Sequence, residues 1–320
     1  MRLLALSLCL LSGAASAKVI WRGDFETGDL SQWTGLNGLL SRLTVVTDPV
    51  RQGRYALRTE LRQGDINSSG TRNELTLASS LFQEVEGNDK WYAWSTLFPA
   101  DYPSNNTWQV FTQWHHSGCC GSPPVEFDVY GERIQLTHDG GTVLWSTPLV
   151  RGVWHDFVVH VFWSSTAGYV DLYYDGTKVL DHQATQTLYP GQYTYLKQGL
   201  YRNANITQVG VVYHDGMVMG TSLADVAPQL ANPPPPPPPP PDGGTPVDPV
   251  VDAGPPAPPP DAGQQTGQDP GPDAGIQVQA GSFYQLPGGG CSHASRETFA
   301  VLGVLVAGLI ALRRRRPPPG

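Results

Sequence analysis

Residues 155–163 read HDFVVHVFW, and residues 168–176 read GYVDLYYDG. Val, Phe, Tyr and Trp dominate both stretches, and β-branched and aromatic residues suit the pleated, half-buried surface of a sheet. The second stretch ends in Asp175-Gly176 and is followed by another apolar run, which is typical of a two-residue hairpin turn. The two stretches therefore predict short β-strands joined by tight turns.

The same pattern extends in both directions along the chain. Further runs of this kind are LTVVT (43–47), WYAWSTLF (91–98) and WQVFTQW (108–114). No long stretch keeps the 3.6-residue period of a surface helix, and Gly, Pro, Asn and Asp interrupt the runs at short intervals. Residues 18–231 are therefore predicted to form one all-β domain, a sandwich or barrel of short strands.

The chain before and after this domain has a different composition. Residues 1–17 combine Arg2, an apolar stretch and an Ala-Ser-Ala end, which is typical of a cleaved signal peptide. Residues 232–287 begin with Asn232 and nine consecutive prolines and continue with segments rich in Pro, Gly and Asp. Such a composition cannot bury a core and predicts a disordered, extended stalk.

The C-terminal segment, residues 288–320, has a pattern of its own. It holds Cys291 in a Gly/Ser setting, an apolar run at 299–312 predicted as a short helix, and an arginine cluster at 313–316. This order resembles the C-terminal sorting tags of myxobacterial surface proteins, which implies transient membrane association and processing near Cys291. A plain membrane anchor is the alternative, although the run is short for a spanning helix. Either way we expect a secreted protein, anchored at the cell surface (outer membrane) or released by C-terminal processing.

The net charge and the positions of the cysteines argue against two kinds of ligand, nucleic acid and a structural zinc ion. The formal net charge is −8, and no basic block occurs in the predicted domain, which argues against nucleic-acid binding. An anionic partner would have to be met by a few placed cations, and we expect a monomer. Cys119 and Cys120 are adjacent, so they form either a strained ring disulfide or a pair of free thiols in a loop, and no second pair completes a zinc cage.

Three segments place polar side chains at alternate positions, so that each set shares one face of its strand. The segments are TRNEL (71–75), FTQWH (111–115) and YLKQGLY (195–201). If the three strands are neighbours in a curved sheet, their polar side chains meet on one surface, around the side-chain-free Gly199. These side chains are Arg72, Glu74, Gln113, His115, Tyr195, Lys197 and Tyr201.

This set of groups suits β-elimination from a uronic acid. The C5 proton of a uronate lies next to a carboxylate, and its removal requires that the carboxylate charge be neutralised. The Gln113 amide and the Arg72 guanidinium are suitable donors for that purpose. A base must take the proton and an acid must protonate the departing O4, and His115 and Tyr201 are the candidates. The chemistry requires no metal or organic cofactor.

The three segments also resemble a known family. Jelly-roll polysaccharide lyases, including alginate lyases, glucuronan lyase and the heparin lyase I group, carry Arg-x-Glu, Gln-x-His and Tyr-x-Lys-x-Gly-x-Tyr strands in this order. The opening WRGDFETGDLSQW (21–33) and the stretch GVWHDFVVHVFW (152–163) look similar too. The resemblance implies a β-jelly-roll (concanavalin A-like) sandwich of two antiparallel sheets and a polysaccharide lyase acting on an anionic, uronate-containing substrate.

The resemblance also implies roles for single residues. Gln113 and Arg72 neutralise the carboxylate, His115 acts as base or charge neutraliser, and Tyr201 acts as acid or as both acid and base. The expected substrate-binding residues are Lys197, Glu74, Tyr195 and Arg202, of which Glu74 would mainly orient Arg72. Alginate lyases have an amide or similar polar pair after the final Tyr, whereas Arg202-Asn203 follows here, which favours a glucuronate-type polymer.

Two alternative functions and one structural metal ion remain to be considered. The strand EFDVYGE (126–132) is similar to the acidic strand of jelly-roll glycoside hydrolases, but Glu132 comes four positions after Asp128, where two or three are needed, and Gly131-Glu132 favours a turn. A lectin-like sandwich would use the many aromatic residues as sugar platforms. The turn FETGD (25–29) resembles the opening of sandwich modules that hold a structural Ca²⁺, and Glu26 is the candidate ligand.

Overall fold

The computed structural model describes residues 18–67, 70–118, 121–227 and 284–285, which form two β-sheets packed face to face. The eight-stranded sheet contains β1 (Val19–Gly23), β3 (Leu43–Val46), β4 (Ala56–Leu61), β7 (Asp89–Leu97), β12 (Trp154–Phe162), β13 (Tyr169–Tyr174), β14 (Thr177–Ala184) and β16 (Gly210–Gly220). The nine-stranded sheet contains β2 (Gly35–Asn37), β5 (Ile66–Asn67), β6 (Gly70–Leu77), β8 (Trp108–His116), β9 (Val125–Tyr130), β10 (Arg133–His138), β11 (Thr142–Pro148), β15 (Thr194–Arg202) and β17 (Tyr284–Gln285). Short helical turns span Leu40–Arg42, Ser80–Phe82 and Leu223–Val226.

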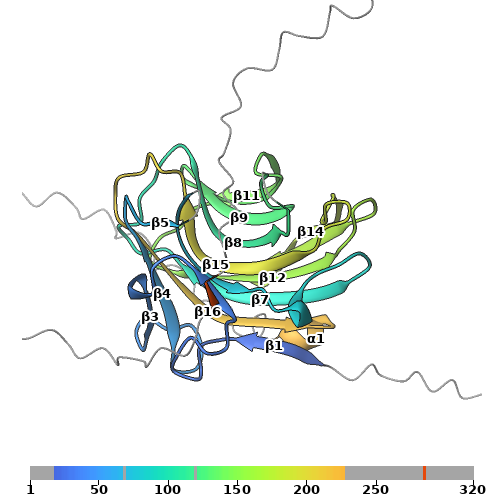
Figure 1. The fold of residues 1–320 in the computed structure, drawn as a ribbon, viewed down its shortest axis with the longest axis horizontal. Helices are drawn as coiled ribbons and strands as arrows, with labels where there is room; N and C mark the ends of the chain where they lie inside the picture. The colour runs from blue at the N-terminus through green and yellow to red at the C-terminus, as the bar shows by residue number, and fades with distance from the viewer. Residues whose placement is uncertain (1–17, 68–69, 119–120, 228–283, 286–320) are drawn as a thin grey trace, which may run out of the picture.

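The strand order explains how distant segments become neighbours. The nine-stranded sheet runs β11-β10-β9-β8-β15-β6-β2-β17, with β5 beside β6, and the eight-stranded sheet runs β14-β13-β12-β7-β16-β4-β3, with β1 beside β16. All pairs are antiparallel except the parallel contact between β17 and β2. Figure 1 shows β8, β9 and β15 as a bent layer over β12, β7 and β16. The predicted all-β sandwich of two antiparallel sheets is confirmed, and the jelly-roll form agrees with it.

The two stretches that indicate the fold class lie where expected. HDFVVHVFW becomes β12 and GYVDLYYDG becomes β13, which pair with each other in antiparallel register. Asp175 and Gly176 have φ values of 47° and 77° and join β13 to β14, because a tight hairpin turn needs left-handed residues at both central positions. Asp139 and Gly140, at 52° and 59°, make a similar turn between β10 and β11.

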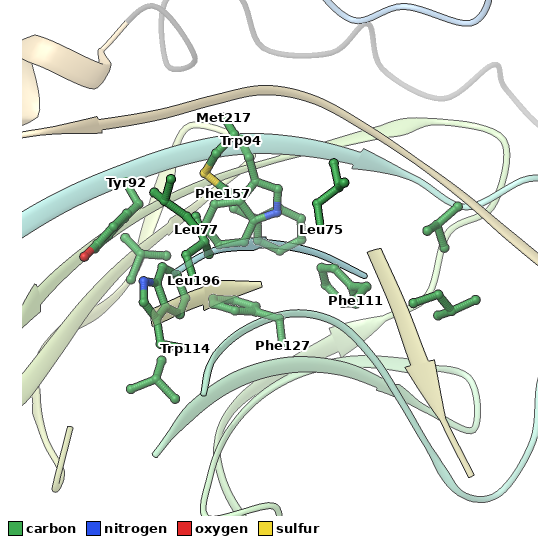
Figure 2. Packing of buried hydrophobic residues seen from close by; sticks show 14 of the residues in the cluster. Leu75, Leu77, Tyr92, Trp94, Phe111, Trp114, Phe127, Phe157, Leu196 and Met217 are labelled. Atoms are coloured by element: carbon green, nitrogen blue, oxygen red, sulfur yellow. The ribbon is translucent and has the colours of Figure 1, made fainter. Parts of the chain in front are cut away.

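The core lies between the sheets and combines aromatic with aliphatic side chains (Figure 2). Trp94 on β7 stacks on Phe157 of β12 at 5.1 Å between ring centroids and meets Phe127 of β9 edge-on at 5.1 Å. Phe111 and Trp114 on β8 belong to the same cluster. Aromatic pairs of this kind contribute about 0.5–1.5 kcal/mol beyond the area they bury. These aromatic side chains therefore hold the two sheets together and are not available as sugar platforms.

Several predicted segments lie outside the described residues. They are the signal peptide (1–17), the sorting tag (288–320) with Cys291 and the apolar run 299–312, the adjacent Cys119 and Cys120, and the stalk (232–287) except for Tyr284–Gln285. Their predictions stay predictions. Among the residues that the structure describes, no helix has the length and apolar character needed to cross a bilayer.

Candidate active site

Polar side chains gather on the face of the nine-stranded sheet that points away from the core, called the outer face below. On β8, Trp114 enters the core, so Gln113 and His115 point outward. On β15, Leu196 and Leu200 enter the core, so Lys197 and Tyr201 point outward. Gln113 is 0 % exposed, Lys197 3 % and Tyr201 9 %. Because these side chains are covered although they face away from the core, the outer face is recessed.

The strand register brings the three predicted segments side by side. β15 lies between β6 and β8, so the TRNEL, FTQWH and YLKQGLY segments occupy three adjacent strands. Lys197 pairs with Gln113 of β8, Tyr195 pairs with His115, and Tyr201 pairs with Arg72 of β6. Directly paired residues of neighbouring strands have Cβ atoms about 4.5–5.5 Å apart. The structure thus brings together the segments that the sequence could only place on separate strands.

A continuous chain of contacts links four of these side chains. The Arg72 guanidinium lies 3.7 Å from the centroid of the Tyr201 ring, and its Nη1 lies 3.4 Å from Glu74 Oε2. Glu74 Oε1 accepts a hydrogen bond of 2.5 Å from Gln113 Nε2. Glu74 therefore orients both Arg72 and Gln113, as expected for Arg72. In the described part of the chain, the buried Arg72 Nε has no hydrogen-bond partner, which leaves one donor of the guanidinium unused.

Gly199 allows this contact chain to cross a strand. Gly199 lies on β15 opposite Glu74, between the strands that carry Glu74 and Gln113. Its φ is 151°, and a Cβ atom there would lie 2.3 Å from the Asn73 carbonyl oxygen and 2.8 Å from the Glu74 Cα. Glu74 and Gln113 can meet because no side chain stands between them.

Gly199→Ala is expected to destabilise the fold by about 1–3 kcal/mol, because the added methyl group meets the β6 backbone at a φ value that disfavours side chains. Gly191→Ala is the matched control, since Gly191 also has a positive φ, 71°, but a Cβ atom at that position would meet nothing within 4 Å. Thermal unfolding measures both variants. An equal loss of stability in the two would show that the contact with β6 is unimportant.

His115 and Tyr201 are held in opposite protonation roles. His115 Nδ1 lies 2.7 Å from the His116 carbonyl oxygen and donates to it, which leaves the lone pair on Nε2. Burial, followed by the nearby Lys197 charge, lowers the pKa of His115 to about 2, so the imidazole is neutral at neutral pH. Burial raises the pKa of Tyr201, against the opposing effect of Arg72, so the phenol keeps its proton. At neutral pH His115 is therefore in the unprotonated state that can accept a proton, and Tyr201 is in the protonated state that can donate one.

Tyr195 and Lys197 complete the outer face beside His115. The Tyr195 ring lies 5.8 Å from the His115 ring, and Lys197 Nζ lies 5.4 Å from the centroid of Tyr195. Tyr195 is only half-buried. Tyr195 and Lys197 therefore share the outer face with His115, and their contact with substrate stays a prediction.

Arg202 lies elsewhere. A step of one residue along a strand turns the side chain to the other face, so Arg202 points between the sheets while Tyr201 points outward. It is 0 % exposed, and its Nη2 donates to the carbonyl oxygens of Leu61 at 3.1 Å and Gln208 at 2.5 Å. The predicted substrate-binding role of Arg202 is therefore incompatible with its position, and so is the argument for polymer specificity that rested on it.

Glu26 acts as a loop anchor in this structure. Its carboxylate accepts backbone hydrogen bonds from Arg54 at 3.0 Å and Tyr55 at 3.1 Å. Among the described residues, one group of three side chains could together hold a metal ion. It consists of Asp171, Asp181 and His182, and Glu26 does not belong to it. Two backbone N–H groups thus donate to the Glu26 carboxylate, and the structural Ca²⁺ at Glu26 stays a prediction.

Two acidic residues on the outer face were not predicted as site residues. Glu126 and Asp128 alternate on β9 with the core residues Val125, Phe127 and Val129 and are 5 % and 4 % exposed. Glu126 pairs directly with Gln113 of β8. The alternating pattern VEFDV could have identified these two residues from the sequence, because acidic residues that alternate with core residues along a strand must point away from the core.

The carboxylate that a hydrolase would need lies apart from these acids. Gly131, with φ 60°, begins the turn after β9, and Glu132 lies in it with 61 % of its side chain exposed. Arg151 Nη1 lies 2.7 Å from Glu132 Oε2, and its hydrogen bonds lower the pKa of Glu132 to about 2. The turn predicted at Gly131-Glu132 is confirmed, and Glu132 does not share the outer face with Asp128.

A jelly-roll sandwich with a recessed face of amide, imidazole, guanidinium and phenol groups is the architecture of a polysaccharide-cleaving enzyme. The polysaccharide lyase family matches residues 25–218, and the chain belongs to this family. It is thus an enzyme of the lyase class that acts on a polysaccharide. No curated protein matches the sequence.

Several solved structures are similar to this chain. Endo-β-1,4-glucuronan lyase from the fungus Trichoderma reesei is 18 % identical, with a TM-score of 0.56 over 65 % of this chain and 98 % of that one. The catalytic domain of a glycoside hydrolase family 131 protein from Coprinopsis cinerea is 16 % identical, with a TM-score of 0.49 over 63 % and 94 %. Alginate lyase vAL-1 from Chlorella virus is 12 % identical, with a TM-score of 0.43 over 63 % and 99 %. At 18 % identity the first of these likenesses concerns the fold alone.

Proposed function

We propose that the protein cleaves a uronic-acid-containing polysaccharide by β-elimination and leaves a 4,5-unsaturated product. The observation that carries this proposal is the contact chain Tyr201–Arg72–Glu74–Gln113, with a neutral His115 on the same recessed face. A binding module has no need for a buried base, a buried acid and a cation held beside one another.

Neutralisation of the substrate carboxylate falls to Arg72 and Gln113. Glu74 holds both side chains in place before substrate binds, so little reorganisation is needed when negative charge spreads from C5 onto the carboxylate. One N–H of the Gln113 amide is used by Glu74, and the second can donate to the carboxylate. Lys197, beside Gln113 on β15, adds a positive charge to the same surface.

The proton transfers fall to His115 and Tyr201. His115 Nε2 takes the C5 proton, and the electrons of the C5–H bond form the C4=C5 double bond. The C4–O4 bond breaks with its electron pair on O4, which receives the Tyr201 phenolic proton. The step balances without metal, oxidant or water, and each proton-transfer group typically contributes about 10²–10⁴-fold.

The proposal is tested by incubating the protein with glucuronan, alginate and unsulfated glycosaminoglycans while following ultraviolet absorbance of the unsaturated product. We expect absorbance to rise with at least one uronate polymer and equimolar new reducing ends to form. Reducing ends without absorbance would indicate hydrolysis, and binding without either would indicate a lectin. Glucuronan is the first substrate to try, because the similar Trichoderma reesei structure is that of a glucuronan lyase.

We propose further that this reaction takes place outside the cell. The apolar, Ala-Ser-Ala-ended residues 1–17 support export, and the Arg313–Arg316 cluster after an apolar run supports a C-terminal membrane stage. Fractionation of the producing cells with an antibody against the domain tests this location.

A further inference from the structure

The outer face continues past Gln113 onto strands that the proposed reaction does not use. Glu126 on β9 pairs with Gln113 on one side and with Thr137 of β10 on the other. Asp128, two residues further along β9, pairs with Gln135 of β10. Neighbouring strands lie about 4.8 Å apart, close to the length of one sugar unit, so these residues line the position next to the proposed uronate site.

Neither acid has a cationic partner. Every ion pair found among the described residues involves other carboxylates, and Thr137 Oγ1, at 3.2 Å from Glu126 Oε1, is a neutral donor. Asp128 Oδ1 is buried and has no hydrogen-bond partner within the described structure. A buried polar atom without a partner destabilises the protein, and a bound hydroxyl group can offset that cost.

Burial shapes the charge of this pair. It raises the pKa of Asp128 to about 7 and the pKa of Glu126 well above its usual value, to which the neighbouring Asp128 also contributes. The other titratable groups that face Glu126 are Glu74 on β6, Asp139 after β10, and the phenols of Tyr189 and Tyr201. A carboxylate added beside Glu126 and Asp128 would therefore face acids and phenols, whereas the cations of the outer face, Arg72 and Lys197, lie on β6 and β15, beyond β8.

We propose that Glu126 and Asp128 form a subsite for an uncharged sugar unit, so that the substrate is a heteropolymer in which the cleaved uronate has a neutral neighbour. This inference rests on the proposed lyase function. Sugar hydroxyls both donate and accept, so they satisfy a carboxyl group in either protonation state. Above about pH 7, where Asp128 ionises, a second uronate would place like charges together in a recessed site, which is strongly unfavourable.

The test compares two polymers that differ only in charge. One is glucuronan, and the other is glucuronan whose carboxyl groups have been partly reduced, so that some glucuronate units have become glucose with the linkage unchanged. We expect kcat/KM per uronate to be roughly tenfold or more higher for the reduced polymer, as expected for relief of a like-charge contact. Equal or higher kcat/KM for intact glucuronan would overturn the proposal.

Substitutions on β9 test whether Glu126 and Asp128 cause the preference for the reduced polymer. In Glu126→Gln/Asp128→Asn, the preference for the reduced polymer should fall to near unity, chiefly because glucuronan becomes a better substrate. Glu132→Gln is the matched control, because it removes one negative charge from the turn that follows β9, where Glu132 pairs with Arg151. An unchanged preference in the double variant, or an equal change in the control, would contradict the assignment.

Two further measurements separate this inference from the lyase function. Calorimetric binding of oligosaccharides from both polymers tests the subsite without turnover, so tighter binding of the reduced oligosaccharide would support it even if no unsaturated product forms. Equal binding, or none, would overturn it. With the unaltered protein, the preference should also widen as pH rises through about 7, because Asp128 ionises there. A pH-independent preference would exclude Asp128 from the subsite.

Discussion

His115→Ala is expected to reduce kcat/KM for elimination by about 10²–10⁴-fold, because it removes the neutral imidazole that accepts the C5 proton. Added imidazole should restore part of the activity, since the vacated space lies beside the proposed uronate site. The low pKa of His115 predicts that the free enzyme loses no base function as pH falls from about 8 to about 5. Initial rates of absorbance increase across this pH range provide the measurement.

The control for this variant is His182→Asn. His182 is exposed on β14 in the other sheet and has a φ of 50°, a conformation that asparagine tolerates well. It should retain full activity. If His115→Ala retains activity within a few-fold of the unaltered protein, His115 serves at most to neutralise charge, and Tyr201 must supply both base and acid.

Tyr201→Phe is expected to lower kcat by a similar factor, about 10²–10⁴-fold, because O4 must then leave without a proton. The substitution keeps the ring that stacks on Arg72 at 3.7 Å, so it removes the hydroxyl group while sparing the guanidinium position. Because burial raises the pKa of Tyr201, the activity of the unaltered protein should persist to alkaline pH and fall only as the phenol ionises. The residual activity of Tyr201→Phe should lack this alkaline loss.

Tyr213→Phe is the corresponding control, because Tyr213 lies on β16 in the other sheet. Thermal unfolding should give the same midpoint for both tyrosine variants within a few degrees. If turnover is unchanged in Tyr201→Phe, the phenol takes no part in the mechanism. If the unfolding midpoint of Tyr201→Phe falls by more than a few degrees, its loss of activity reflects a folding defect.

The alternation of side chains along single strands is a local property that the amino-acid order predicts. Gln113-Trp114-His115 and Tyr195 to Tyr201 have one face in the core and one outside, as the period of two requires. The turns at Asp175-Gly176 and Asp139-Gly140 are equally local, because their backbone needs residues that tolerate positive φ. The predicted role of Arg202 was wrong because it followed from its place after Tyr201 in the family pattern, whereas its strand position turns that side chain inward.

The candidate site itself required the strand order. Nothing local indicates that β15 inserts between β6 and β8, since β15 begins at Thr194, long after β8 ends at His116. The 2.5 Å hydrogen bond between Gln113 and Glu74, and its dependence on Gly199, follow from that insertion. Glu126 and Asp128 became site residues only when β9 was found beside β8.

The amino-acid sequence by itself determined that this protein is an all-β sandwich and which side chains share a face of each strand, because both depend on interactions between residues close along the chain. Only the tertiary structure decided which faces adjoin, which charges meet, and which imidazole and phenol are buried enough to change their pKa values. Those properties arise from long-range pairing and from exclusion of water, which no short stretch of sequence carries.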